Sequence, residues 1–268
     1  MSSNGKLDVL ISTYGVEGLQ RVTKMNLPQV EGVRYVVSLQ NPENKLIEIP
    51  ELLTRPDVLI SIINSKGLSK NRNNAISLSE ADVCLIADDD LQYTEQQLLA
   101  VLETFRSQPN VDVAMFKYDG DNKLYPDKVV NLSEGMPKNY YPSSVEIAFR
   151  RSSLLAKGIK FNENFGIIAR YGCCEDPLFL HDCIDAGLNC VFFPITITTH
   201  NGVSTGNRPM MRPDLPEAHG AYIRRVYGFS GILRVPLFAW RNHRTGRLRF
   251  WWGLRYLLKG FLANPASR

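Results

Sequence analysis

Acidic residues are missing from the C-terminal part of this 268-residue chain. From Ala218 onward there are ten Lys or Arg residues and no Asp or Glu. The first 217 residues carry the other 21 basic side chains and all 27 acidic ones. The formal net charge of +4 is therefore the sum of an acidic body and a basic tail. The two parts of the chain therefore have to be interpreted separately.

Long apolar runs are missing as well, because none approaches the roughly 20 residues that cross a bilayer. The start of the chain has no charged segment, apolar core and small-residue cleavage site of the kind that marks a signal peptide. We therefore expect a cytoplasmic protein that does not span a membrane by itself. The proportions of 44% hydrophobic and 22% charged residues exclude a disordered, collagen-like or coiled-coil protein.

Cysteines are few, and their odd number of five fits a reducing compartment. Four of them surround His181 in the sequence: Cys173, Cys174, Cys183 and Cys190. They lack the paired spacing of structural zinc sites, so we expect buried thiols rather than zinc.

Several common enzyme motifs are absent: G-x-G-x-x-G after a strand, G-x-x-x-x-G-K-[ST], H-E-x-x-H and G-x-S-x-G. Their absence argues against common dinucleotide-binding enzymes, P-loop NTPases, zincins and α/β-hydrolases.

Short apolar runs rich in β-branched residues alternate with helical signals. Because these runs are apolar at nearly every position, they predict strands that are covered on both faces. The predicted strands are residues 7–12, 33–39, 58–63, 83–87, 111–116, 145–149 and 190–199. Residues 120–142 have no clear period and are interpreted as a loop. This order predicts an α/β fold with a mostly parallel, Rossmann-like sheet flanked by helices, whose ligands bind at the carboxyl ends of the strands.

Capping signals delimit three of the helices. One helix is predicted from Ser69 to about residue 79, and a second from the capping box of Thr94 and Gln97 to about residue 106. A third has Asp176 as its N-cap, proline at the next position and Gly187 just past its end.

Three carboxylates, Asp88, Asp89 and Asp90, end an apolar strand. Side chains two apart on an extended segment point the same way, so Asp88 and Asp90 can converge on one point. Two anions so close need a cation between them, and Mg²⁺ or Mn²⁺ accepts such oxygen ligands and commonly holds a substrate diphosphate as well. The alternative is a solvated loop or a helix cap, where Asp is also common.

Other polar side chains lie at predicted element ends. Arg72, near a helix start, suits phosphate, although an exposed amphipathic helix has the same composition. Glu175 and Asp176 begin another helix, where one carboxylate can cap the helix while the other acts as a general base. His200 follows the last predicted strand, where it is either a histidine with satisfied hydrogen bonds or a ligand for Mn²⁺ beside the carboxylates.

In chain order these pieces resemble the family 2 glycosyltransferases, GT-A fold enzymes that move a sugar from a nucleotide diphosphate donor to an acceptor hydroxyl with inversion. The likeness covers about residues 7–200. Its motifs are VLISTY (9–14), GLS and RN (67–69 and 72–73), LIADDD (85–90), VEIAFRR (145–151), FNE and FG (161–163 and 165–166) and GCCEDPLFL (172–180).

The resemblance implies a nucleotide-sugar site in the first half of the chain. Thr13, Tyr14 and Arg72 would line the nucleotide pocket. Asp88 would face the ribose or a metal-bound water. Asp89 is also expected among the residues that bind the nucleotide sugar. Gln40 stands where the family usually has an acid that reads the nucleobase; a hydrogen bond from Gln40 to uracil would make the donor a UDP-sugar.

The resemblance also implies the reacting groups. Asp90 and His200 would bind the Mn²⁺ or Mg²⁺ ion. Asp176 would be the base that takes the proton of the acceptor hydroxyl, and Glu175 would hold the acceptor sugar. A metal site and a separate acid are what such a transfer requires, because the leaving diphosphate gains negative charge and a hydroxyl is a poor nucleophile at neutral pH.

The basic tail, residues 218–268, contains all three tryptophans. As a helix over residues 247–262, it would place Phe250, Leu257 and Phe261 on one face with its cations away from that face. This pattern is typical of a segment in a membrane interface. We expect residues 1–217 to form the GT-A domain and the tail to bind the inner face of the cell membrane. The alternative is a helix packed on the catalytic domain or on a second subunit.

The expected function is therefore an inverting transfer to a glycan acceptor, lipid-linked, in surface polysaccharide synthesis. No nucleic-acid partner is expected, since nothing in the chain resembles an RNA- or DNA-binding module. Two alternatives stay open: a sugar nucleotidyltransferase, whose fold is similar, and a non-catalytic membrane or nucleic-acid adaptor with an inert transferase-like body.

Overall fold

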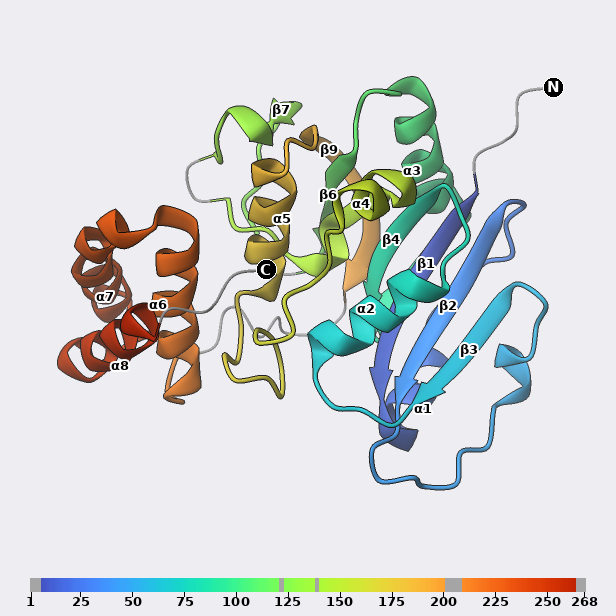
Figure 1. Cartoon of the computed structure of the whole chain (residues 1–268). Coiled ribbons are helices and arrows are strands. Elements are labelled where there is room, and N and C mark those ends of the chain that lie inside the picture. The colour runs from blue at the N-terminus through green and yellow to red at the C-terminus, as the bar shows by residue number, and fades with distance from the viewer. Residues whose placement is uncertain (1–5, 121–122, 138–139, 201–208, 264–268) are drawn as a thin grey trace. The chain divides into compact units, whose positions relative to one another are not determined.

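The computed structural model describes residues 6–120, 123–137, 140–200 and 209–263 (Figure 1). The chain divides into two compact units. The first unit comprises residues 1–66, 70–160 and 182–202, and the second comprises residues 67–69, 161–181 and 203–268. The expected domain boundary after residue 217 falls inside helix α6, Asp214–Tyr227. The two compact units are divided at other positions in the chain.

A mixed β-sheet forms the centre of the first unit. Its strand order is β3-β2-β1-β4-β8-β6-β9-β5, with β7 paired to β9. The strands are β1 Leu7–Tyr14, β2 Val33–Gln40, β3 Val58–Ile63, β4 Val83–Asp88, β5 Leu91–Gln92, β6 Val113–Asp119, β7 Val130–Asn131, β8 Ile147–Arg150 and β9 Cys190–His200. Strands β1 to β4 pair in parallel, as do β6 and β9, whereas β8, β5 and β7 pair antiparallel to their neighbours.

The sheet is therefore less parallel than the sequence predicts. Strand β8 lies between β4 and β6 and runs against both of them. The described residues between β6 and β8 contain no α-helix that could serve as a crossover and bring β8 back in parallel. The interpretation of residues 120–142 as loop is wrong at β7, which pairs with β9 (Figure 1). Strand β8 also begins two residues after its predicted start, because residues 144–146 form a 3₁₀ turn.

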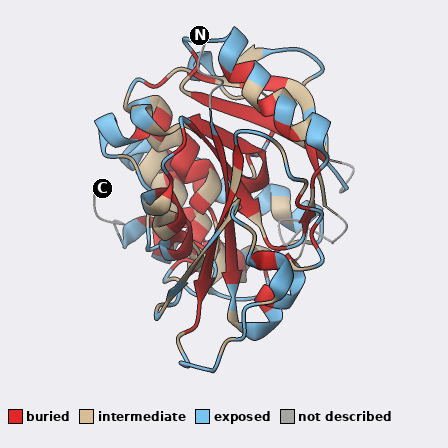
Figure 2. Cartoon of the chain, turned by 90° about the vertical axis from the view of Figure 1, so that its right-hand side faces the viewer, coloured by how far each residue is buried: buried red, intermediate tan, exposed pale blue. Residues whose placement is uncertain are grey.

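Burial explains why the strands are apolar at nearly every position. Strands β1, β2 and β4 are buried along almost their whole length, and Figure 2 shows the sheet largely in the colour of buried residues. Both faces of these strands are covered, which removes the alternation of polar and apolar residues that a half-exposed strand shows.

Five α-helices accompany the sheet in the part of the chain up to residue 200 that the structure describes. They are α1 Gly15–Val22, α2 Leu68–Leu78, α3 Glu95–Ser107, α4 Arg151–Lys157 and α5 Glu175–Asp185. The capping box of Thr94 and Gln97 at α3 is confirmed. The N-cap prediction for Asp176 is wrong, because α5 begins at Glu175 and Asp176 lies in its first turn. Gly187 does follow the end of this helix with a φ of 79°.

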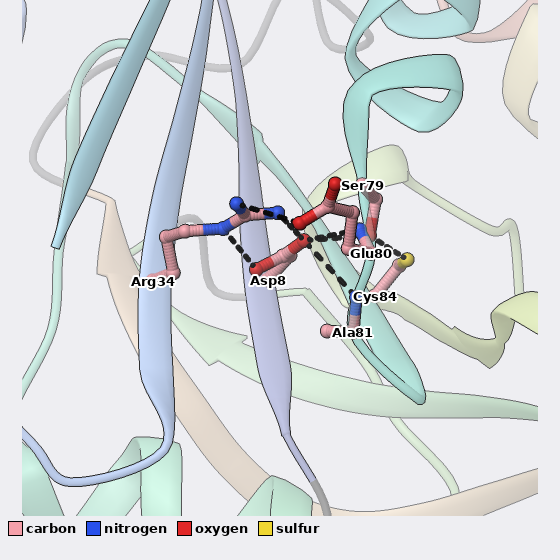
Figure 3. Close-up of polar contacts among 6 residues, drawn as sticks. All are labelled: Asp8, Arg34, Ser79, Glu80, Ala81 and Cys84. Carbon is pink, nitrogen blue, oxygen red and sulfur yellow. Dashed lines mark hydrogen bonds and ion pairs between the residues drawn. The ribbon is translucent and has the colours of Figure 1, made fainter.

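A buried carboxylate holds together the amino-terminal ends of β1 and β2 (Figure 3). Asp8 is 2% exposed and accepts hydrogen bonds from Nε and Nη2 of Arg34 at 2.9 and 2.8 Å. The Ser79 hydroxyl donates at 2.7 Å, and the backbone N–H groups of Glu80 and Ala81 donate at 3.0 and 3.3 Å. Burial alone raises the pKa of Asp8, but these hydrogen bonds outweigh it and the pKa lies below its usual value.

The second unit contains the helices of the basic tail. These are α6 Asp214–Tyr227, α7 Arg234–Arg244 and α8 Phe250–Leu262, with a 3₁₀ segment at Phe229–Leu233. The predicted tail helix is confirmed at α8, although it begins three residues later than residue 247. No helix among the described residues is long and apolar enough to cross a bilayer.

Helices α6 and α8 pack against each other at unusually short distance. A Cβ added at Gly220 would lie 2.0 Å from the carbonyl oxygen of Leu257, and one at Gly260 would lie 1.9 Å from that of Glu217. Glycine is thus required on both helices at the crossing point. Leu257 and Phe261 are buried there in an apolar cluster. Part of the face predicted to enter a membrane therefore packs against protein.

Candidate active site

The carboxyl ends of β1, β2 and β4 bring several of the predicted nucleotide-site residues to one edge of the sheet. In the parallel register Tyr14 lies beside Gln40, and Ser12 lies beside Asp88. Thr13, Tyr14, Gln40 and Asp88 consequently share this edge, as the prediction of a ligand site at the strand ends requires.

Asp90 and His200 lie together although 110 residues separate them in sequence. Strand β5 begins directly after Asp90 and pairs with β9 so that Leu91 lies opposite His200. The pairing puts Oδ2 of Asp90 3.2 Å from Nε2 of His200. The Asp90 side chain is 45% exposed and that of His200 is 14% exposed. The His200 ring meets the Tyr118 ring edge to face, with 6.2 Å between the ring centroids, which restricts its orientation.

This pair fits the metal that the family resemblance implies. Two neighbouring ligands of an octahedral Mg²⁺ or Mn²⁺ ion, each about 2.1 Å from the metal, lie about 3 Å apart. The 3.2 Å between the Asp90 oxygen and the His200 nitrogen matches this distance. A carboxylate is a ligand that suits Mg²⁺ and Mn²⁺, and imidazole is a common ligand of metal ions in proteins. The partial exposure of Asp90 leaves room for further ligands from water or a substrate phosphate.

Arg72 is a buried cation fixed beside Asp88. Its side chain is 2% exposed, and its Nη2 donates to Oδ1 of Asp88 at 3.1 Å and to the Ser144 hydroxyl at 2.7 Å. The neighbouring Asn71 donates to the carbonyl oxygen of Thr13 at 2.9 Å, which ties α2 to the end of β1. Arg72 thus orients the Asp88 carboxylate, which remains 39% exposed.

Asp89 points differently from its two neighbours. Its Oδ1 accepts from Nε of Arg21 at 2.9 Å, and its Oδ2 accepts from Nη2 of Arg21 at 2.8 Å and from the Thr13 hydroxyl at 2.5 Å. Burial raises the pKa of Asp89, while the hydrogen bonds from Arg21 and Thr13 act in the opposite direction. This carboxylate connects β4 with β1 and α1. The contact between Arg21 and Asp89 could not be predicted from the sequence, because a helix pattern does not reveal a partner 68 residues away.

The remaining nucleotide-site candidates have contrasting environments. Gln40 is 2% exposed and its Nε2 donates to the Ser65 hydroxyl at 2.9 Å, so its amide is held in one orientation. Tyr14 at the end of β1 is 36% exposed. The exposed ring of Tyr14 provides a stacking surface at this sheet edge, whereas the amide of Gln40 is buried and already hydrogen-bonded.

The predicted acceptor residues belong to the second unit. Glu175 and Asp176 occupy the first turn of α5, where the helix dipole favours carboxylates. Glu175 is 8% exposed, whereas Asp176 is only partly buried. The segment before the helix is fixed by the Ser69 hydroxyl, which donates to the Phe165 carbonyl oxygen at 2.6 Å.

With this geometry in place, the class of protein follows from comparison with known families. Residues 48–171 match the model described as glycosyl transferase family 2. The match covers slightly less than half of the chain, and it confirms the resemblance to family 2 glycosyltransferases seen in the sequence. The matched segment includes Arg72 and the three acids that end β4. No curated protein matches the chain in sequence.

Solved structures with a similar fold include those of TarS from S. aureus. The structure of TarS 1-349 in complex with UDP is 18% identical, with a TM-score of 0.59 over 85% of this chain. The structure of TarS 1-349 in complex with UDP-GlcNAc is also 18% identical, with a TM-score of 0.57. The chain covers 65% of the first of these structures and 40% of a longer TarS structure. The fold is therefore α/β and GT-A-like, with a mixed sheet flanked by helices.

Proposed function

We propose that the protein is a metal-dependent, inverting glycosyltransferase that uses a nucleotide diphosphate sugar as donor. The observation that carries the proposal is the grouping of Asp88, Asp90, His200 and Arg72 in a chain that matches the glycosyl transferase family 2 model. Asp90 and His200 supply oxygen and nitrogen ligands for a divalent ion that could bind a diphosphate, and the buried Arg72 holds the neighbouring Asp88 in place.

In this proposal each residue has a defined task. Asp90 and His200 hold Mn²⁺ or Mg²⁺, which when bound supplies electrostatic stabilisation for the charge that develops on the leaving diphosphate. Asp88, oriented by Arg72, receives the ribose. Asp176 accepts the proton of the acceptor hydroxyl at its carboxylate, and Glu175 hydrogen-bonds the acceptor sugar.

We further propose a UDP-sugar as the donor. Two of the similar TarS structures were solved with UDP and with UDP-GlcNAc, which supports uracil recognition in this fold. The exposed ring of Tyr14 offers a stacking face for the base. Gln40 lies beside Tyr14, but its amide is buried and donates to Ser65, so uracil would bind Gln40 only after this side chain has moved. Thr13 contributes less directly, because its hydroxyl is engaged by Asp89.

A donor-binding assay tests the proposal. Nucleotide sugars with Mn²⁺ should raise the melting temperature of the protein, because only a donor that binds the folded state stabilises it. Asp90→Ala should abolish the metal-dependent shift, whereas Asp176→Asn should keep the shift and lose transfer. No shift with any nucleotide sugar would support an inert adaptor. Release of diphosphate from a nucleoside triphosphate and a sugar phosphate would support a nucleotidyltransferase instead.

We also propose that the second unit binds the cytoplasmic face of an anionic membrane, where a lipid-linked glycan would be the acceptor. Helices α7 and α8 and the 3₁₀ segment before them expose large apolar side chains: Phe229, Leu233, Leu237, Trp240, Trp251 and Leu262. Trp240 and Trp251 also line a cavity of about 910 Å³ together with Arg249. Arg244 lies over the Trp240 ring at 5.1 Å. Exposed tryptophans beside cations, in a segment without acids, complement an anionic lipid surface.

Flotation with lipid vesicles tests this part. Because α8 packs against α6, deletion of the tail would disrupt the second unit, and point substitutions are more informative. The double variant Trp240→Ser and Trp251→Ser should bind anionic vesicles at least tenfold more weakly than the wild type. Leu46→Ser, which alters an exposed leucine of the first unit, is the control. Equal flotation of all three proteins would refute membrane binding, and equal turnover of lipid-linked and free acceptors would refute the acceptor.

A further inference from the structure

Two adjacent cysteines and a distant histidine converge in the second unit. Cys173 and Cys174 precede α5, and His219 lies on α6. Sγ of Cys173 is 3.6 Å from Sγ of Cys174, and Sγ of Cys174 is 3.4 Å from Nδ1 of His219. All three atoms lie within 4.8 Å of one another. We propose that these three residues form a binding site for Zn²⁺, separate from the oxygen-rich site at Asp90.

The distances match those of a tetrahedral zinc site. With Zn–S and Zn–N distances of about 2.3 and 2.05 Å, tetrahedral angles put two sulfur ligands about 3.8 Å apart and a sulfur and a nitrogen about 3.6 Å apart. The observed separations of 3.6 and 3.4 Å need only small adjustments. Thiolate and imidazole are the ligands that zinc prefers, whereas Mg²⁺ selects oxygen.

The backbone conformation brings the two thiols to the same side. Neighbouring side chains of an extended segment point in opposite directions. Cys174 instead has a φ of 75°, a left-handed conformation that is unfavourable for a residue other than glycine. Such strain at a residue other than glycine points to a task for its side chain that glycine cannot perform.

The surroundings hold the imidazole and the second thiol in place. The His219 ring packs against the Phe238 ring with 4.6 Å between centroids. Cys174 itself lies in a buried apolar cluster with Leu178. Such a shell holds the ligands in place and limits access of water.

Three protein ligands leave the fourth position of zinc open for water or another group. The carboxylate of Asp214 lies close by, since a Cβ added at Gly172 would be 2.1 Å from its Oδ2. Arg212 already binds this carboxylate at 2.7 Å, so water is the simpler fourth ligand.

A bound ion would connect the start of α5 with α6. Cys174 directly precedes Glu175, so zinc would fix the turn that carries Glu175 and Asp176. Zinc would thereby raise the turnover number only if Asp176 is the base, so this consequence rests on the proposed function. The binding of zinc itself does not depend on that function. The two ideas can therefore fail separately.

Metal analysis of the full chain tests the site. After incubation with Zn²⁺ and removal of excess metal, native mass spectrometry should show one tightly bound zinc per wild-type chain. The double variant Asp90→Ala and His200→Ala should keep this ion. Removal of a ligand, in Cys174→Ala or His219→Ala, should weaken binding by more than about 100-fold. Cys183→Ala, which removes a buried thiol outside the cluster, should retain zinc.

Cobalt gives a second readout that does not depend on activity. Co²⁺ added to the metal-free wild type should produce thiolate-to-metal charge-transfer absorption, and this band should be absent from the double variant Cys173→Ser and Cys174→Ser if that variant keeps the wild-type circular dichroism spectrum. Wild-type protein that binds no zinc, or that loses it equally in Cys183→Ala, would overturn the proposal. A disulfide between Cys173 and Cys174 in protein purified under reducing conditions would overturn it as well.

Discussion

Asp89 and Asp90, two of the three consecutive acids at the end of β4, should respond in opposite ways to the same substitution. Asp89→Asn removes the charge that accepts two hydrogen bonds from Arg21 and one from Thr13. Breaking a fully buried ion pair costs about 3–5 kcal/mol, but the Arg21 side chain is 48% exposed and therefore screened. Asn also keeps one acceptor oxygen. We expect a loss of about 2 kcal/mol, which lowers the melting temperature by about 4–8 °C.

Asp90→Asn should show the reverse pattern. Its side chain is 45% exposed and contacts His200, so we expect a change in unfolding free energy within about 0.5 kcal/mol. Donor binding that depends on Mn²⁺ should instead be lost. Thermal unfolding with and without Mn²⁺ and donor, measured for both variants side by side, separates the two effects. If Asp89→Asn left stability unchanged but abolished donor binding, the assignment of Asp89 as a structural residue would be refuted.

Three further outcomes are expected. Asp8→Asn should cost about 3 kcal/mol, because it breaks a buried pair with Arg34. Since the folded state lowers the pKa of Asp8, its stabilising effect is present above about pH 3.9 and disappears as the pH falls through the folded-state pKa; denaturant titrations should show a steeper acid loss for the wild type than for the variant. Gly260→Ala should destabilise by about 1–3 kcal/mol, because its Cβ would lie 1.9 Å from a carbonyl oxygen of Glu217, and an unchanged melting temperature would contradict this packing. Asp176→Asn should lower kcat by at least about 100-fold with little change in donor KM; full turnover would exclude it as the base.

Local sequence features predicted most of the secondary structure. Strands β1, β2 and β4 could be found because burial on both faces leaves a continuous apolar run. Strand β3 has the same apolar pattern, although it lies at the edge of the sheet with Leu59 and Ile62 exposed. Helix α3 could be found because its capping box satisfies backbone groups within three residues. The antiparallel position of β8 escaped prediction, since strand order depends on long-range pairing. Strand β7 was missed for the same reason, because two residues without an apolar pattern form a strand only where β9 is available to pair with them.

The candidate site shows a similar division. Asp88 and Asp90 were predicted from the alternation of side chains along a strand. Asp89 was grouped with them because its partner Arg21 is distant in sequence. The amphipathic pattern of the tail identified a helix, but only tertiary packing decides whether an apolar face meets protein or lipid. Packing of α8 on α6 covers Leu257 and leaves Trp251 exposed.

The sequence by itself determined the main strands and the strand ends that carry the candidate site, because short-range burial and capping leave a readable pattern. Its motifs, in their order along the chain, determined the resemblance to a known class of protein. Tertiary structure alone decided which distant side chains meet. It paired Asp90 with His200 through β5 and β9, and it brought His219 to Cys174 from another helix. The free energy of such contacts depends on positions in space, which spacing along the chain does not encode.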